Sequence, residues 1–430
     1  MAYLPNILFG LILTGGIGFF VQNLNKLRRN IKLGKSVDIE GPTKDRWANM
    51  ARVALGQSKM ITRPISGILH IVVYLGFIII NIEVLEIIID GLFGTHRIFS
   101  SLGSIYGILI GTFEILAVLV FIAVIIFWIR RNGIRLKRFL SPEMEGWPKQ
   151  DGNFILYFEI VLMALFIIMN ATDVQFQAMN SGNIISQFMA PYFEGLPLHT
   201  IERTAWWLHI VGILFFLNYL YYSKHLHILL AFPNTYYGRL TPNGQLDNLD
   251  SVTNEVKLMM DPDADPYAMT EDSAGEVEKF GASDIFDLNR IQLLNAYTCT
   301  ECGRCTSECP ANQTGKKLSP RKIMMDTRDR LEEVGQILDN NNGKFKADDK
   351  QLLGDYITPE ELWACTSCNA CVEACPVSIN PLSIILDMRR YLVMEQSAAP
   401  TELNTMMTNI ENNGAPWPYN QMDRLNWKNE

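Results

Sequence analysis

Apolar residues are concentrated in the first half of the chain, and the second half has the mixed pattern of an ordinary polar protein. Five apolar segments are long enough to cross a bilayer, which takes about 20 helical residues. These segments are residues 3–24, 64–89, 104–129, 153–171 and 204–231. Helical periodicity returns near residue 285 and continues to about residue 398. The pattern predicts an all-α protein, with a five-helix transmembrane bundle over 1–232 and a helical domain over 285–398.

Two further segments complete the predicted organisation. Residues 233–284 are acidic and contain proline, which is typical of an extended linker with little regular structure. Residues 399–430 are rich in asparagine but also carry Trp417, Tyr419 and Trp427. Because tryptophan and tyrosine are enriched at protein interfaces, we expect this tail to dock onto a partner.

Lysine and arginine are distributed unevenly among the connections between the apolar segments. They gather after the first and third segments, within residues 26–59 and 130–138, and the other two connections are nearly bare. Basic connections of this kind stay in the cytoplasm. The pattern therefore predicts an outside N-terminus and, after five spans, a cytoplasmic second half. The net charge of −8 leaves no basic excess for binding nucleic acid.

The eight cysteines form two quartets, each with the spacing C-x2-C-x2-C-x3-C-P. This is the spacing of bacterial ferredoxins with two [4Fe–4S] clusters, in which the fourth cysteine of each quartet binds the other cluster. Zinc ribbons instead use two separated C-x2-C pairs, and disulfides do not suit a cytoplasmic domain. The predicted ligands of cluster one are Cys299, Cys302, Cys305 and Cys375, and those of cluster two are Cys365, Cys368, Cys371 and Cys309.

The helices around these quartets have recognisable start signals. Ser319-Pro320 follows the first quartet, and Thr358-Pro359 precedes the second. A hydroxyl residue followed by proline is typical of an N-cap and the first helical position. We therefore expect an α-helical cluster domain, not a small β-rich ferredoxin.

Four of the six histidines fall inside the predicted spans: His70, His209, His225 and His227. Ionisable groups at that depth are costly and usually functional. Two imidazoles from facing helices can hold a b-type haem as its axial ligands. The alternative for any one of these histidines is a hydrogen bond to a neighbouring helix.

Depth and helical phase suggest which histidines form the pair. His70 and the His225/His227 pair lie at similar depths from the cytoplasmic ends of their segments. In a continuous fifth helix, His209 and His227 share a face because they are five turns apart. This favours His227 as the partner of His70 and leaves His225 near a quinone site or as a group that orients a ligand. A bend at "YYSKHLH" would reverse that choice.

Two cationic and two acidic residues complete the candidate membrane site. Arg63 and Lys224 lie where haem propionates would emerge, and Glu114 and Glu159 could move protons for a quinone or form structural hydrogen bonds. A second haem at His209 is a further alternative. The position that would supply its second ligand, ten residues after His70, is Ile80.

Both halves of the chain resemble known redox families. "GILHIVVYLGF" and "WWLHIVGILFFLNYLYYSKHLHI" resemble the cytochrome b subunits of the nitrate reductase gamma and membrane heterodisulfide reductase families. "YTCTECGRCTSECPANQTGKKLSPRKI" and "WACTSCNACVEACPVSINPL" resemble the iron–sulfur subunit of heterodisulfide reductase. Together they are similar to membrane oxidoreductases that exchange electrons between electron-transfer flavoprotein and menaquinone.

This resemblance implies a function and a set of partners. It implies haem ligation by His70, His209 and the His225/His227 pair, in the cytoplasmic membrane of a bacterium or archaeon. Members of that type continue into a cysteine-rich CCG domain that carries the substrate-side cofactor. Two clusters would use every cysteine of this chain, so we expect the CCG domain, or electron-transfer flavoprotein, to be a separate partner and assign no catalytic residue here.

The sequence therefore predicts an electron-transfer subunit of a quinone-linked membrane oxidoreductase. Electrons would pass between menaquinone, haem b, two [4Fe–4S] clusters and the cytoplasmic partner. Two alternatives remain: a redox-sensing membrane iron–sulfur protein, and a structural subunit of a larger respiratory complex.

Overall fold

The computed structural model describes residues 3–39, 41–262 and 279–429. Helices make up its regular structure, and the described residues form no strand. Five helices are long and apolar enough to cross a membrane, so the predictions of an all-α fold and of five spans are confirmed. The spans are α1 (Leu4–Ile31), α3 (Pro64–Phe93), α4 (Ser104–Trp128, continuing to Gly133), α5 (Trp147–Thr172) and α8 (Leu198–Tyr219, continuing to Tyr222).

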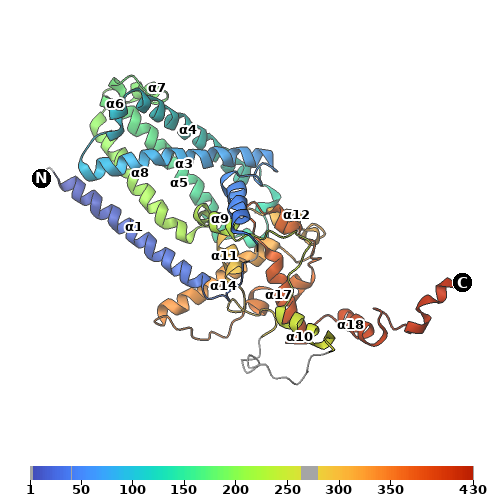
Figure 1. The fold of residues 1–430 in the computed structure, drawn as a ribbon. Coiled ribbons are helices and arrows are strands. Elements are labelled where there is room, and N and C mark those ends of the chain that lie inside the picture. The colour runs from blue at the N-terminus through green and yellow to red at the C-terminus, as the bar shows by residue number, and fades with distance from the viewer. Residues whose placement is uncertain (1–2, 40, 263–278, 430) are drawn as a thin grey trace.

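The spans lie side by side at one end of the molecule, and the helices of the second half gather at the other end (Figure 1). Small residues let the spans approach closely, as is usual within membranes. A Cβ added at Gly76 of α3 would lie 2.4 Å from Val120 of α4, and one at Gly212 of α8 would lie 2.9 Å from Leu162 of α5. Glycine at these positions sets the spacing of the bundle.

The fifth span ends earlier than the hydropathy pattern predicts. Helix α8 passes through a 3₁₀ turn to Tyr222, Ser223 is extended, and a new helix, α9 (His227–Tyr236), begins at His227. Buried Asp151 holds this break, accepting hydrogen bonds from the Tyr219 hydroxyl at 2.5 Å and the Ser223 hydroxyl at 2.7 Å. The prediction of one continuous helix over residues 204–231, on which the choice of His227 depended, is therefore wrong.

Helix α9 belongs to the packing of the second half of the chain. It packs against α2 (Thr43–Met50) and α11 (Arg290–Thr298). Leu226 and Leu230 share one buried core with Ile285 and Leu293. The membrane bundle and the cysteine domain are thus joined through a common apolar core.

The segment expected to be an irregular linker is partly helical, because α10 spans Asp250–Met260. Residues 263–278 of that segment lie outside the described residues. The acidic composition of the linker is a property of the sequence alone.

Short helices surround the cysteines, as predicted. The Ser319 hydroxyl accepts from the Lys322 amide at the start of α14, and Thr358 and Glu361 form a capping box at the start of α15. The helices of this domain are α11, α12 (Arg304–Glu308), α13 (Pro310–Gln313), α14 (Pro320–Asn340), α15 (Pro359–Trp363), α16 (Ala370–Ala374) and α17 (Pro381–Met394).

The last two helices, α18 (Thr401–Asn413) and η11 (Gln421–Lys428), project away from the body of the molecule (Figure 1). Trp417, Tyr419 and Trp427 lie in this tail and are all exposed. Exposed aromatic side chains of this kind commonly become buried when a partner binds.

Arg330 of α14 supplies a test of what stabilises the cysteine domain. Its guanidinium is fully buried and donates to Asp284 at 2.9 Å, to Asp348 at 2.5 Å and to the Lys350 carbonyl at 2.7 Å. Arg330→Met leaves both carboxylates without their partner, so we expect a loss of about 3 kcal/mol in unfolding free energy. Urea denaturation followed by circular dichroism measures this loss. The control Lys350→Met removes only an exposed ion pair with Glu333, and its cost should be below about 1 kcal/mol; equal losses in both variants would contradict this role for Arg330.

Candidate iron–sulfur and haem site

The two cysteine quartets adopt the same backbone conformation. Glu301 and Ser367 have φ of 53° and 55°, and Gly303 and Asn369 have φ of 70° and 59° before the short helices α12 and α16. The fourth cysteine of each quartet is extended and is followed by proline, at Cys309-Pro310 and Cys375-Pro376. Helices α12 and α16 pack against each other, so the quartets form an internal repeat arranged face to face.

The first group of thiols surrounds a cavity. Cys299, Cys302, Cys305 and Cys375 line this cavity, which we call the four-cysteine cavity and which measures about 370 Å³ with its opening to solvent included. Cys371 of the second quartet also reaches its wall. The fourth cysteine of the second quartet thus lies with the first three cysteines of the first quartet. This grouping is the one expected if the quartets exchange their fourth ligands, which stays a prediction.

The remaining thiols form a second group. Cys365 and Cys371 each interact electrostatically with Cys309 and Cys368. All eight cysteines are free, so none of them is paired in a disulfide. Burial raises the pKa of Cys299 to about 12 and that of Cys375 to about 11. Metal binding has to displace those protons, because the thiolate is the ligand.

Positive charge is held next to the four-cysteine cavity without a matching carboxylate among the described residues. Arg304 lines the cavity, is 4% exposed, and donates to the Lys59 and Met60 carbonyls at 2.9 and 3.3 Å. Arg138 lies against Gly303, and its buried Nε has no hydrogen-bond partner. A cluster bound by four thiolates is an anion. The Arg304 guanidinium, which lines the cavity, therefore fits a negatively charged group there, and Arg138 adds positive charge nearby.

Two cations at ends of the membrane spans contact the cysteine domain. Arg63 donates to Ser307 at 2.7 Å and to Glu308 at 2.6 Å, and Lys224 forms an ion pair with Glu301. Both cations were expected beside haem propionates, and the structure pairs both with carboxylates of the cysteine domain. They act as contacts between the two halves of the chain.

A third contact comes from the cysteine domain itself. Arg321, fully buried, donates to the Arg138 carbonyl and to Glu143, both at 2.7 Å. Because Arg138 also touches Gly303, this contact holds the second basic connection directly over the four-cysteine cavity.

The structure brings His70 and His227 together at the junction of the two halves. Their ring centroids are 6.4 Å apart and their planes are inclined by 42°. Two imidazoles on opposite sides of one metal ion, with each nitrogen ~2 Å from the metal, place their centroids roughly 6 Å apart. His227 Nδ1 lies 3.1 Å from the Lys224 carbonyl, and this bond leaves Nε2 free as a ligand. The pair fits the axial ligands of one haem iron.

His225 lies beside this pair and faces a different neighbour. Its ring centroid is 5.3 Å from that of His227, and its Nε2 is 3.7 Å from Glu159. The break at Ser223 therefore places His227 next to His70, although the bend was expected to favour His225.

His209 lies in the interior of the bundle, away from the other histidines named above. Its Nδ1 is 3.1 Å from the Leu162 carbonyl, and its buried Nε2 has no partner. The position that would face it from α3, Ile80, belongs to the apolar core. The described residues place no second imidazole beside His209, so the donor set here does not fit a haem with two histidine ligands.

Glu114 has a structural role. Its carboxylate accepts hydrogen bonds from the Asn170 side chain at 3.0 Å and from the Ile185 and Ser186 amides at 2.7 and 3.1 Å. It anchors the connection between α5 and α8, and we do not assign it to proton transfer.

Sequence reasoning missed two groups of residues. Arg304 and Arg138 were not singled out, because their roles depend on contacts between distant segments. Glu83, Glu86 and Asp90 of α3 were also missed, and they line a pocket at the far end of the bundle. Their spacing of three and four residues inside an apolar span was a visible signal, since acids at that depth are costly.

The comparisons with known proteins agree with this geometry. Residues 298–379 match the 4Fe-4S dicluster domain family. The chain is 30% identical to a probable iron-sulfur-binding oxidoreductase, FadF, of Bacillus subtilis, across 99% of this chain and 61% of that protein. It is 25% identical to the EtfAB:quinone oxidoreductase of Syntrophomonas wolfei, across 88% of this chain and 53% of that protein. The chain thus spans less than two thirds of the length of either relative.

A third relative matches a shorter part of the chain. It belongs to the ferredoxin/F(420)H(2)-dependent CoB-CoM heterodisulfide reductase of Methanosarcina acetivorans, and it is 32% identical across 28% of this chain and 60% of its own length. No solved structure matches the chain. The chain is an iron–sulfur electron-transfer protein related to these oxidoreductases, and it carries five helices suited to a membrane.

The exchange of fourth cysteines gives a direct test of the cluster ligands. Cys375→Ala should remove or alter the same cluster as Cys302→Ala, and Cys309→Ala the same cluster as Cys368→Ala, because each pair lies in one thiol group. Iron analysis of the wild type should give about eight iron atoms per chain for two [4Fe–4S] clusters. Electron paramagnetic resonance then compares the cluster that survives in each variant. If Cys375→Ala instead matched Cys368→Ala, the assignment would be wrong.

Proposed function

We propose that this chain carries electrons between a membrane quinone and a soluble redox partner, through one b-type haem and two [4Fe–4S] clusters. His70 and His227 hold the haem. Cys299, Cys302, Cys305 and Cys375 hold one cluster, and Cys365, Cys368, Cys371 and Cys309 hold the other. Each of these groups supplies a centre that takes up and releases one electron at a time when bound.

The placement of Arg304 carries this proposal. Arg304 lines the four-cysteine cavity and donates to the Lys59 and Met60 carbonyls, in the turn that precedes α3, the helix of His70. The Lys59–Met60 turn, which binds Arg304, lies against the first turn of α3, where a Cβ at Gly67 would be 2.6 Å from the Met60 carbonyl. The histidine pair and the four-cysteine cavity are therefore neighbours, as a chain of redox centres requires.

The residues of the chain control the surroundings of these centres. Each thiol group contains two buried cysteines, and Cys368 of the second group is the exposed one. The first group borders the membrane half through Arg304, which bonds the Lys59 and Met60 carbonyls, and the second group reaches solvent at Cys368. This order supports electron transfer from the histidine pair through the first group to the second, or the reverse.

The two ends of the route rest on different observations. The quinone end rests on the kinship with an EtfAB:quinone oxidoreductase and on the five spans. The soluble end rests on the exposed cysteine group and on the tail with Trp417, Tyr419 and Trp427. We propose that this tail binds a soluble protein that carries the substrate-side site, such as a CCG-domain protein or electron-transfer flavoprotein.

The orientation follows from the docking of the basic connections. The segments that contribute Arg63 and Arg138 lie against the cysteine domain, and basic connections stay in the cytoplasm. We therefore place the cysteine domain on the cytoplasmic side, where reduced thiols and clusters persist.

Histidine variants test the haem. His70→Ala and His227→Ala should each lose most of the bound haem b, since either change removes one of two axial ligands. His225→Ala is the matched control and should retain it, because His225 faces Glu159. Pyridine haemochrome assays on purified protein, normalised to iron–sulfur content, measure the effect. Full haem in His227→Ala with loss in His225→Ala would reverse the ligand assignment.

Arginine variants test the electrostatic role of Arg304. A buried positive charge stabilises the reduced, more negative cluster, so Arg304→Gln should lower the midpoint potential of the cluster in the four-cysteine cavity. A shift of about 60 mV corresponds to a tenfold change in a one-electron equilibrium. Arg389→Gln is the counterpart, since Arg389 bonds the Cys365 carbonyl of the second group. Potentiometric titration should show each variant shifting a different cluster, and Arg304→Lys should recover most of the value. An unchanged potential in Arg304→Gln would contradict this role.

A further inference from the structure

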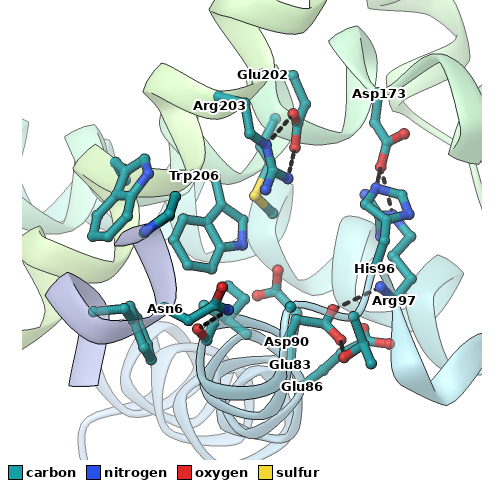
Figure 2. Close-up of a pocket in the computed structure, with 18 residues that line it drawn as sticks. Asn6, Glu83, Glu86, Asp90, His96, Arg97, Asp173, Glu202, Arg203 and Trp206 are labelled. Carbon is teal, nitrogen blue, oxygen red and sulfur yellow. Dashed lines mark hydrogen bonds and ion pairs between the residues drawn. The ribbon is translucent and has the colours of Figure 1, made fainter. Parts of the chain in front are cut away.

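A polar pocket, which we call the far-face pocket, lies at the end of the bundle away from the cysteine domain. Figure 2 shows the residues that line it. It is formed by the start of α1, the end of α3, the connection after α3, the end of α5 and the start of α8. Its cavity volume is about 320 Å³. Pockets for small ligands are typically about 300–1,000 Å³.

Three carboxylates follow one another along the α3 wall of this pocket. Glu83, Glu86 and Asp90 are three and four residues apart and so share one face of the helix. Glu83 and Glu86 are 2% and 3% exposed, and Asp90 is partly exposed. Over the roughly 10 Å of rise from Glu83 to Asp90, the row leads from the interior toward the far-face surface.

The outer two members of the row are hydrogen-bonded. Glu86 accepts from the Phe99 amide at 2.9 Å and from the Tyr106 hydroxyl at 3.2 Å, and Asp90 accepts from the Arg97 amide at 2.6 Å. Glu83 differs, because its buried Oε2 has no hydrogen-bond partner among the described residues. An unpaired buried carboxylate oxygen is costly, and such a group is expected to meet a ligand or a proton.

The other acids of the pocket already have cationic partners. Asp173 accepts from Arg97 Nε at 2.7 Å and lies 3.2 Å from His96 Nε2, and Glu202 is paired with Arg203. Burial alone would raise the pKa of Asp173, but its bonds to His96 and Arg97 hold that pKa below the usual range. His96, Asp173 and Glu202 lie close enough together to ligate a metal. A divalent ion there would sit beside two guanidiniums, which disfavours a metal as occupant.

The opposite wall is aromatic. Trp206 contacts Phe9 and Trp207 at centroid distances of 5.5 and 5.1 Å, and Arg203 lies 5.3 Å over the Trp206 ring. Trp206 is itself buried beneath Arg203, so a flat ring in the pocket would meet this wall at the Arg203 guanidinium, which can stack on a ring. Arg203 and His96 provide hydrogen-bond donors at the rim, and Glu83 provides an acceptor at the base.

These features match the head group of a quinone, which has a flat ring, two oxygens that accept hydrogen bonds and, when reduced, two hydroxyls that donate them. We propose that the far-face pocket binds the quinone head group and that Glu83 accepts or returns its protons, with Glu86 and Asp90 continuing the path to water. Oxidation of one quinol breaks two O–H bonds. Its two electrons pass singly to the one-electron acceptors of the proposed function, and its two protons pass in turn to Glu83. Reduction runs the same steps in reverse.

This inference rests on the proposed function and adds a position and a proton acceptor to it. It also places quinone chemistry at the end of the bundle opposite Glu159, the acid beside His225 near the cysteine domain. Glu159 is therefore the comparison for Glu83, since both are acids within the spans, Glu83 buried and Glu159 partly buried.

The experiment uses the purified chain in detergent. Binding of a fluorescent hydroxyquinoline N-oxide, a quinol analogue, is measured by titration, and reduction of the bound haem by a short-chain menaquinol is followed spectroscopically. Glu83→Gln should weaken analogue binding and slow menaquinol-driven haem reduction at least about tenfold, equivalent to ~1.4 kcal/mol. Dithionite should still reduce the haem fully. Glu83→Asp should recover part of the rate, and Glu159→Gln should behave as the wild type.

The outcomes separate the inference from the proposed function. If Glu83→Gln reduces its haem as fast as the wild type and Glu159→Gln does not, the far-face site is wrong. The proposed function would still stand. A wild-type chain that binds haem but shows neither analogue binding nor menaquinol-driven reduction overturns both. Titration with Mn²⁺ is the remaining arm, and tight binding of Mn²⁺ that displaces the analogue would assign the pocket to a cation instead.

Discussion

Balance of buried charge between the two halves of the chain is the constraint on which the rest of the structure depends. Burying a guanidinium is costly unless an anion or several acceptors surround it. Among the described residues, Arg304 lines the four-cysteine cavity without a carboxylate partner, whereas Arg321 and Arg63, in the same interface, have Glu143 and Glu308. A thiolate-bound cluster would supply the missing negative charge. The same interaction that docks the cysteine domain therefore also prepares it for an anionic cofactor.

The break in the fifth span brings His227 to the place where the two halves of the chain dock. Asp151 draws the Ser223 hydroxyl and the Lys224 amide into hydrogen bonds, and Lys224 in turn meets Glu301 between two cysteines of the first quartet. The helix that follows begins at His227, which faces His70. A continuous helix would have carried both imidazoles of "HLH" along the axis of the span. The bend instead places one of them against α3, next to the cysteine domain.

The two ends of the bundle have opposite electrostatic character. Arginines from the basic connections gather at the end that meets the cysteine domain, and carboxylates gather in the far-face pocket. Cationic surroundings favour electron-rich clusters, and a row of buried acids favours proton exchange. Quinol oxidised in the far-face pocket would thus release its protons at that end of the bundle, and its electrons would pass to the centres proposed at the other end.

Local pattern in the sequence determined the number of spans, the helical class and the caps at Ser319 and Thr358. It also predicted how the cysteines divide into two groups of thiols. These features depend on hydropathy, hydrogen bonding and spacing within short segments, and all of that information is local. Tertiary structure decided the position of His227, because a buried carboxylate on another helix, Asp151, sets where the fifth span breaks. It also decided that Arg63 and Lys224 meet carboxylates of the cysteine domain. Ile80 joins an apolar core, and no second imidazole lies beside His209 among the described residues. Three acids of α3 line a pocket with α1 and α8. Each of these outcomes depends on which residues of distant segments come into contact. The spacing of residues within one segment does not determine those contacts.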